Sequence, residues 1–282
     1  MVVAATMPGA TLSARLPPQH GYVTSVIQIP TSPQQVNAFG RDINGDGRVD
    51  NALGQFFAAL EAQNLDFEGD TTTAIDGGQL LMLHALRTPS FKKTKKATWQ
   101  VLYAKPTAAP KFDGNDKLTV DGSAPSSIRL RATILRNRVR TAAGTIPVEL
   151  DLGGILVLHL QKGVIFATCS QTTCSNGRIT GVVTKGDLDN LLIPQLAVLF
   201  SAAVAHDCPG PGPESCTNGS TGQTLQELFD ANDDLVITSA ELSQNSFFEA
   251  LLAPDIDLNH DGKPDAISVG FGFDTVRAKI VR

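Results

Sequence analysis

"SSIRLRATILR", from Ser126 to Arg136, decides the class of fold, because apolar and polar side chains alternate along it. Residues 128, 130, 132 and 134 are apolar, whereas 129, 131 and 133 are arginine or threonine. Successive side chains of a strand point to opposite faces, so this pattern predicts a strand with one buried face. Further short strands are predicted at 98–104, 146–152, 154–160, 163–169, 178–183 and 267–281. Strands spaced this closely favour an antiparallel β-sandwich or barrel-like core over parallel βαβ units.

Helical patterns flank these strands. Apolar residues at 53, 56, 57 and 60 recur at steps of three and four, which predicts an amphipathic helix over 51–64. Residues 187–206 predict one long helix, or two that break at Pro194. We expect this segment to be buried, because its apolar run is too short to span a membrane. A shorter helix is predicted over 224–230, with Thr224 and Glu227 as its capping box.

The elements together predict an α+β protein with one folded domain. Residues 1–35 are expected to form an extended lead-in, with one strand at 22–29, and residues 36–282 the domain itself. Its β core is expected at about 72–184 and 266–281, with a helical, EF-hand-like region at about 187–254. The net charge of −5 gives no reason to expect nucleic acid as a partner.

The four cysteines form two close pairs, Cys169 with Cys174 and Cys208 with Cys216. Neither pair has the spacing of a zinc or thioredoxin site, and both lie in polar, turn-rich segments. We therefore expect two local disulfides, the alternative being four reduced cysteines in a cytosolic protein. The first residues lack the regions of a signal peptide, so the export that disulfides suggest implies a signal or lipid anchor outside this sequence.

Two acidic segments share the spacing Asp-x-Asn-x-Asp-Gly-x-x-Asp, at 42–50 and 257–265. Alternate residues of a tightly curled loop point inward, and the glycine permits the sharp turn. Calcium takes six to eight oxygen ligands, so side chains and one backbone carbonyl per loop are placed to bind it. The expected ligands are Asp42, Asn44, Asp46, Arg48 (carbonyl) and Asp50 in the first segment, and Asp257, Asn259, Asp261, Lys263 (carbonyl) and Asp265 in the second.

A third acidic segment, "DANDDLVITSAE" at 230–241, has the ligand order of an EF-hand. Thr238 and Glu241 also predict a capping box for the helix that follows. Leu235 stands where the EF-hand family has glycine, and a positive φ there would cost about 1–2 kcal/mol, so this loop is expected to bind most weakly. The expected ligands are Asp230, Asn232, Asp234, Val236 (carbonyl), Thr238 and Glu241.

The other two segments resemble an EF-hand only in their first half, because Leu53 and Ser268 stand where the family has glutamate. They resemble more closely the short calcium loops of thrombospondin type 3 repeats and integrin-type propeller blades, and the first also resembles half of a dockerin. As a whole, the chain resembles uncharacterised bacterial secreted and envelope proteins with EF-hand-like loops. That resemblance implies extracellular or cell-envelope location and no particular activity.

The sequence thus predicts a calcium-binding protein with up to three structural calcium ions, no transmembrane span and no catalytic motif. Two alternatives remain: a binding or adhesion module for a glycan or protein partner, and a hydrolase with dispersed catalytic residues. Arginines crowd 129–140, and we interpret most of them as the solvent face of a sheet rather than a site for anionic glycans or lipids. His84 and His159 lie in apolar strands and are expected to be packed.

Overall fold

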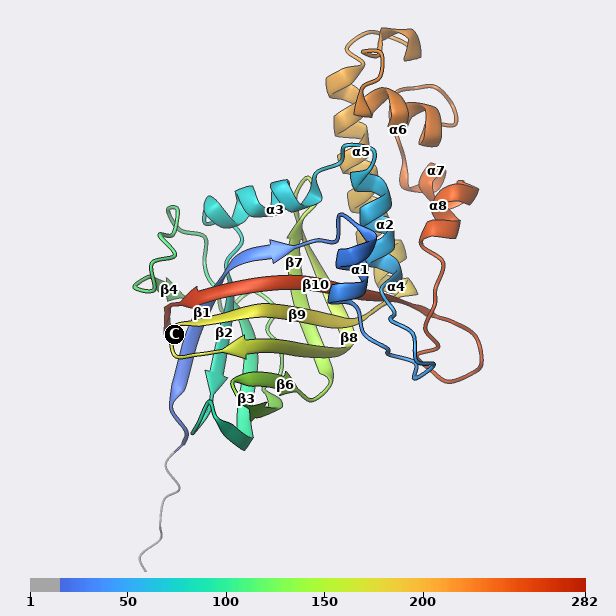
Figure 1. The fold of residues 1–282 in the computed structure, drawn as a ribbon. Coiled ribbons are helices and arrows are strands. Elements are labelled where there is room, and N and C mark those ends of the chain that lie inside the picture. The colour runs from blue at the N-terminus through green and yellow to red at the C-terminus, as the bar shows by residue number, and fades with distance from the viewer. Residues whose placement is uncertain (1–15) are drawn as a thin grey trace, which may run out of the picture.

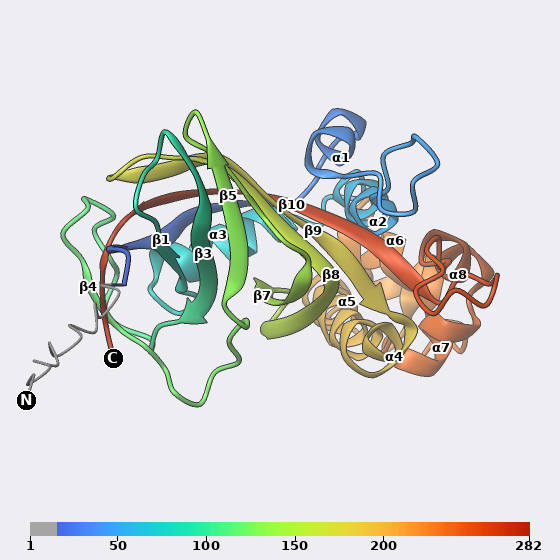
Figure 2. The same cartoon turned by 90° about the horizontal axis from the view of Figure 1, so that it is seen from below.

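Nine strands form one antiparallel sheet that closes on itself. The computed structural model describes residues 16–282. The strand order is β6-β5-β3-β2-β1-β10-β9-β8-β7, and β6 also pairs with β8, so every strand except β7 belongs to a closed barrel (Figure 2). The strands are β1 Gln19–Gln28, β2 Met82–Arg87, β3 Lys93–Tyr103, β5 Leu130–Leu135, β6 Arg138–Thr141, β7 Gly144–Asp151, β8 Ile155–Cys169, β9 Thr173–Thr184 and β10 Ala266–Arg277, with β4 Lys117–Thr119 and β11 Lys279–Val281 as a separate parallel pair.

The alternation that predicted the sheet decides which side chains fill the barrel. Leu130, Ala132 and Ile134 of β5 are buried, whereas the residues between them are exposed. On the neighbouring strand β3, Trp99 is fully buried. His84 of β2 is also fully buried and is therefore packed, as predicted. The antiparallel core is thus confirmed, with its strands closed into a ring by the β6–β8 pairing.

The helices lie outside the barrel. Figure 1 shows α3 across one end of the barrel and the other helices at the side toward which β8, β9 and β10 extend. We call α4–α8 the helical lobe. The helices are α1 Pro33–Phe39, α2 Ala52–Glu61, α3 Phe67–Asp76, α4 Lys185–Asp187, α5 Ile193–Asp207, α6 Thr221–Phe229, α7 Ser239–Gln244 and α8 Ser246–Leu251, with a π-helical turn at Leu188–Leu192 and a 3-10 turn at Pro213–Ser215.

The predicted long helix is continuous from Lys185 to Asp207 and does not break at Pro194. Proline has no N–H to donate, and the π-helical turn that immediately precedes α5 changes the hydrogen-bond pattern where that donor is missing. Leu192, Leu196 and Phe200 are buried. By length and mean hydropathy of 1.6 the helix could also cross a membrane, although 39% of its apolar window is buried in the protein. The absence of a membrane span therefore stays a prediction.

Several predicted boundaries were wrong. The expected strands at 154–160 and 163–169 are one strand, β8, which continues through a register shift between Gln161 and Val164. Residues 72–76 belong to α3 rather than to the β core. β1, expected within the lead-in, lies between β2 and β10 in the main sheet, while residues 1–15 fall outside the described residues. The helix predicted from Thr224 begins at Thr221 and is capped by Ser220, which is the nearer hydroxyl to its first free N–H groups.

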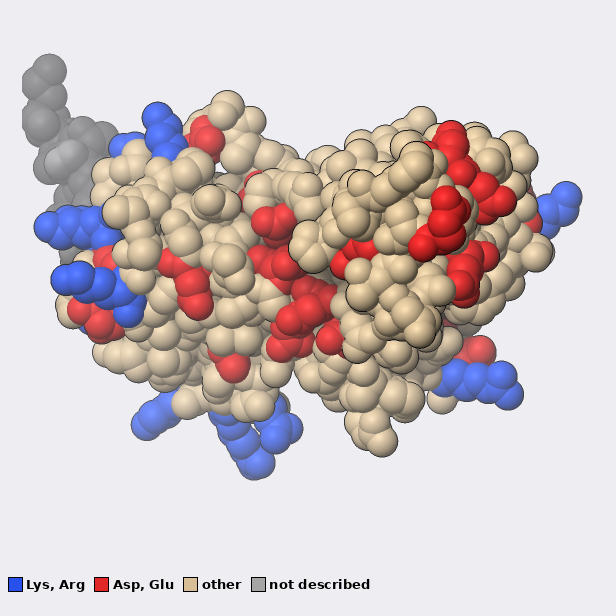
Figure 3. Space-filling view, turned by 90° about the horizontal axis from the view of Figure 1, so that it is seen from above, with Lys and Arg blue, Asp and Glu red and all other residues tan. Residues whose placement is uncertain are grey.

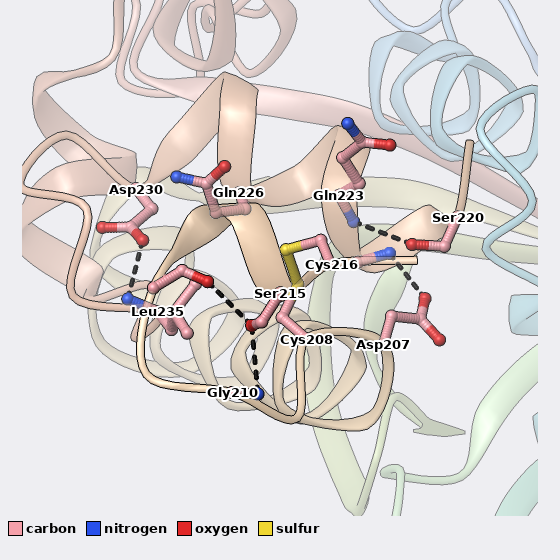
Figure 4. Close-up of a disulfide and its surroundings, with 12 residues drawn as sticks. Asp207, Cys208, Gly210, Ser215, Cys216, Ser220, Gln223, Gln226, Asp230 and Leu235 are labelled. Atoms are coloured by element: carbon pink, nitrogen blue, oxygen red, sulfur yellow. Dashed lines mark hydrogen bonds between the residues drawn. A yellow bond between two sulfur atoms is a disulfide. The ribbon is translucent and has the colours of Figure 1, made fainter. Parts of the chain in front are cut away.

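Both predicted disulfides are present. Cys169 and Cys174 face each other across the β8–β9 pair. Cys208 and Cys216 join the end of α5 to the segment that leads into α6, as Figure 4 shows. Beside this bridge, the carboxylate of Asp207 accepts a hydrogen bond from the N–H of Gly222 at 2.8 Å. The second disulfide therefore fixes the turn between two helices of the helical lobe.

Removing the second disulfide is expected to lower the free energy of unfolding by about 2–3 kcal/mol, because it releases a closed loop in the unfolded chain. The variant is Cys208→Ala with Cys216→Ala, measured by urea unfolding, and peptide mapping without reductant checks both bridges in the parent protein. A parent protein that carries free thiols, or whose cysteines are paired differently, would contradict the assignment.

Candidate metal-binding loops

Three acidic loops join helices to their neighbours. Loop 1 (42–50) connects α1 to α2, loop 2 (230–241) runs from α6 into α7, and loop 3 (257–265) leads from α8 to β10. Their backbones share one feature, a positive φ at both the fourth and the sixth position. These residues are Gly45 (86°) and Gly47 (84°), Asp233 (59°) and Leu235 (64°), and His260 (64°) and Gly262 (88°). Leu235 therefore has the left-handed conformation that the sequence predicted to be strained.

The same hydrogen bonds recur inside all three loops. The carboxylate at the first position accepts a hydrogen bond from the N–H at the sixth, the asparagine at the third from the fifth, and the aspartate at the fifth from the seventh. The first set joins Asp42 to Gly47 (3.0 Å), Asp230 to Leu235 (2.8 Å) and Asp257 to Gly262 (2.8 Å). The third set joins Asp46 to Arg48 (2.8 Å), Asp234 to Val236 (2.9 Å) and Asp261 to Lys263 (2.9 Å). The chain therefore curls in the same way around each row of oxygens.

The last acidic side chain of each loop folds back to the second position. Asp50 accepts the N–H of Ile43 at 2.6 Å, and Asp265 accepts the N–H of Leu258 at 2.7 Å. In loop 2 the N–H of Ala231 donates to Glu241 at 3.1 Å. Glu241 is the twelfth residue of its loop, whereas Asp50 and Asp265 are the ninth. The missing glutamate of loops 1 and 3 is thus replaced by an aspartate nearer in sequence.

Glu241 also completes the predicted capping box with Thr238. Its partial burial would raise its pKa, but hydrogen bonds from Thr238 and from the N–H of Ala231 outweigh this and lower the pKa. Burial likewise opposes a lowered pKa at Asp257, where N–H groups of Gly262 and its neighbours favour the carboxylate. These side chains are therefore held as anions by the loops themselves.

Loops 1 and 3 lie together. Their second residues, Ile43 and Leu258, pack against one small cluster formed by Val182, Ile256 and Ala266. A short antiparallel bridge closes each loop, between residues 41 and 50 and between residues 256 and 266. Two loops more than two hundred residues apart in sequence therefore meet at one end of β9 and β10.

Ser268 of β10 connects the segments that flank the two loops through hydrogen bonds. Its hydroxyl donates to Asp255 at 2.6 Å and accepts from the N–H of Ala52, the first residue of α2, at 2.8 Å. Burial raises the pKa of Asp255, and the charge of Asp50 adds to this effect while the bonds from Ser268 reduce it. The sequence shows only that Ser268 stands where an EF-hand has glutamate. Its hydrogen bonds to Asp255 and Ala52 depend on the folded structure, so the sequence does not predict them.

Loop 2 is attached to the helical lobe instead. Ile237 is buried, and its N–H and carbonyl both bond to the hydroxyl of Ser201 on α5, each at 2.9 Å. In paired EF-hands this position bridges to a second loop, whereas here a helix provides the partner.

Figure 3 shows acidic side chains gathered on the face of the molecule seen from above.

The predicted ligands lie in three similarly curled loops, but their side chains are not gathered into a ready-made metal centre. Within residues 16–282, no three His, Cys, Asp or Glu side chains form a group that could hold a metal ion. The loop carboxylates accept backbone N–H groups instead.

One buried carboxylate lies apart from the loops. Burial raises the pKa of Glu149 on β7 to about 7, and the charge of Asp121 adds to the effect. Its N–H donates to the hydroxyl of Tyr103 at 3.0 Å, and that hydroxyl donates to the carbonyl of Pro147 at 3.0 Å. Tyr103 therefore satisfies backbone groups of β7, and we interpret this network as structural.

No protein-family model, curated protein or solved structure matches this chain.

Proposed function

We propose that this is a secreted or cell-envelope protein in which up to three calcium ions hold α2 and the helical lobe against the barrel. The calcium is structural, and no catalytic activity is proposed. The observation that carries the proposal is the repetition of one backbone conformation and one hydrogen-bond pattern in three loops with different flanking elements. A solvated acidic turn has no reason to repeat both, whereas calcium binding requires oxygens converging from alternate residues.

In each loop the side chains at the first, third and fifth positions and the carbonyl at the seventh would hold the ion. The last carboxylate, Asp50, Glu241 or Asp265, would complete the set. A bound calcium ion neutralises carboxylates that otherwise repel one another over a few ångströms. Loops 1 and 3 would then fix the start of α2 beside the start of β10, and loop 2 would fix α6 beside α7.

The two disulfides support the location. They are compatible with an oxidising compartment, and bonds of this kind are rare in the cytosol. Extracellular or cell-envelope location remains part of the proposal.

Isothermal titration of the purified protein with calcium tests the proposal. We expect up to three binding events per chain and much weaker binding of magnesium, which demands a stricter octahedral geometry. Heat exchange no greater than that of a buffer blank, after treatment with a chelator, would contradict the proposal.

Leu235→Gly is expected to raise the calcium affinity of loop 2 by up to about tenfold. Glycine adopts a positive φ without the cost of about 1–2 kcal/mol that leucine bears, and about 1.4 kcal/mol corresponds to a factor of ten. Leu235→Ala is the matched control, because it removes the same apolar contacts but keeps the strained Cβ. An equal gain in both variants would show that strain does not limit this loop.

A further inference from the structure

The outer wall of the barrel carries a cavity beside loop 1, with a volume of about 610 Å³. Five cationic residues line it: Arg41, Lys95, Arg131, Arg140 and Lys162. The other lining residues are apolar or are threonines, and none is acidic. We call this the basic cavity.

The strands explain why the cations converge. Arg131 and Arg140 lie on the exposed faces of β5 and β6, where Thr133 and Arg140 are directly paired. Lys95 lies in the register shift of β3, and Lys162, with a φ of 50°, lies in the register shift of β8. Such irregularities redirect side chains, and they are frequent beside binding sites.

The cations of the basic cavity have no carboxylate partner. The ion pairs in the described part of the chain are those of Lys185 with Asp189 and of His206 with Asp207, on the helical lobe. Arg41 instead donates to the hydroxyl of Thr180 at 3.1 Å. Its pKa is lowered by burial first and by the nearby charge of Arg140 second, although Asp50 partly opposes this. The five cations therefore form no close ion pair, and the charges of Asp50 and Asp42 act on Arg41 from beyond ion-pair distance.

One side chain of the basic cavity is also held in place. Arg140 and Arg178 both lie over the ring of Phe166, at 5.3 and 4.5 Å from its centroid. The three residues lie in one row across β6, β8 and β9. A guanidinium that packs on an aromatic ring loses less freedom when it binds an anion, so Arg140 is preorganised.

We propose that the basic cavity binds a compact polyanion, namely a sugar that carries two or more sulfate or phosphate groups. Arginine presents a planar fork of donors that matches such oxyanions, and threonines and small alanines leave room for a sugar. The lining has no aromatic residue, and Phe166 beside it is covered by the two guanidinium groups, so bases find no stacking platform. This inference goes beyond the proposed role of calcium and does not depend on it.

The test compares ligands on one protein by isothermal titration at low salt. The probes are a disaccharide with at least two sulfate groups, the same disaccharide without sulfate, single-stranded RNA and vesicles of anionic phospholipid. We expect the sulfated disaccharide to bind at least about tenfold more tightly than the unsulfated one, because its affinity comes from charge-assisted hydrogen bonds.

The variant Arg131→Ala with Arg140→Ala is expected to reduce that affinity at least about tenfold. Its control is Arg129→Ala with Arg138→Ala, which removes equal charge from the same segment but from outside the basic cavity. Melting curves verify that both variants fold. Equal losses in the two variants, no binding of the sulfated disaccharide to the parent protein, or tighter binding of RNA or vesicles would each overturn the proposal.

Discussion

Excess calcium is expected to raise the melting temperature by more than about 10 °C relative to the same protein in a chelator. A ligand that binds only the native state stabilises it by about 2.7 kcal/mol per site at a hundredfold excess over Kd, or roughly 8 kcal/mol for three loops. For a chain of this size, each kcal/mol corresponds to about 2–4 °C. Scanning calorimetry with calcium, with magnesium and with chelator measures the effect, and magnesium is expected to restore little of it.

Single substitutions measure how much of the calcium-dependent rise in melting temperature depends on each loop. Asp46→Ala and Asp261→Ala each remove a carboxylate from the fifth position, and each is expected to remove part of the calcium dependence. Asp113→Ala is a matched control. Asp113 is also an exposed turn carboxylate that accepts a hydrogen bond from an N–H two residues on, at 2.9 Å, but it lies in none of the three loops.

Asp113→Ala is therefore expected to keep the full response to calcium. A melting temperature that changes with neither chelator nor calcium would show that the loops are acidic turns that bind no ion. Loss of the response in the Asp113 variant as well would show that calcium acts through general surface charge.

Local patterns predicted the parts of the fold that local physics determines. The alternation along 126–136 predicted β5, and the stripe along 51–64 predicted α2, because burying one face needs only the right period. The spacing at 42–50 and 257–265 predicted two alike loops, since Gly47 and Gly262 mark the required positive φ. That loop 2 adopts the same conformation at Leu235, without a glycine, was not predicted. The capping box at Thr238 is equally local.

What the sequence did not predict depends on contacts between distant segments. Asn51 was recognisable as a residue that begins a helix, but its side chain also accepts the N–H of Gly270, which is 219 residues away, at 2.8 Å. The closure of the barrel likewise depends on pairing between separate segments, in which residues 138–140 of β6 pair with 166–168 of β8. α3 was missed because its sequence is rich in threonine and has only a weak apolar stripe.

The interior of the barrel makes the protein sensitive to acid through His84. The indole N–H of Trp99 donates to Nδ1 of His84 at 3.1 Å, so the neutral ring carries its proton on Nε2 and donates it to Thr24 Oγ1 at 2.8 Å. The ring also stacks on Phe273, 5.0 Å away. A second proton would have to enter Nδ1, where it would face the Trp99 N–H in a fully buried site. Burial accordingly lowers the pKa of His84 to about 3.

Acidification from pH 6.5 to 3 is therefore expected to remove roughly 4 kcal/mol of stability through this residue alone. Above pH 6.5 the ring is neutral in both states and contributes no pH dependence. Below pH 6.5, His84 of the unfolded chain binds a proton. In the folded protein the pKa of His84 is about 3, so the ring does not bind this proton. Falling pH consequently favours unfolding until the folded ring is protonated too.

His84→Gln separates this effect from the titration of carboxylates, because glutamine cannot take up the proton. The variant is expected to be less stable at pH 7.5, since it loses the stacked ring. Between pH 7.5 and 4.5, however, it should lose about 3 kcal/mol less than the parent protein, as measured by urea unfolding. His159→Gln replaces a partly exposed histidine of β8 and should keep the acid sensitivity of the parent. If the His84 variant lost as much stability as the parent over this range, the buried imidazole would have to accept a proton in place, and the hydrogen bond from Trp99 could not hold it neutral.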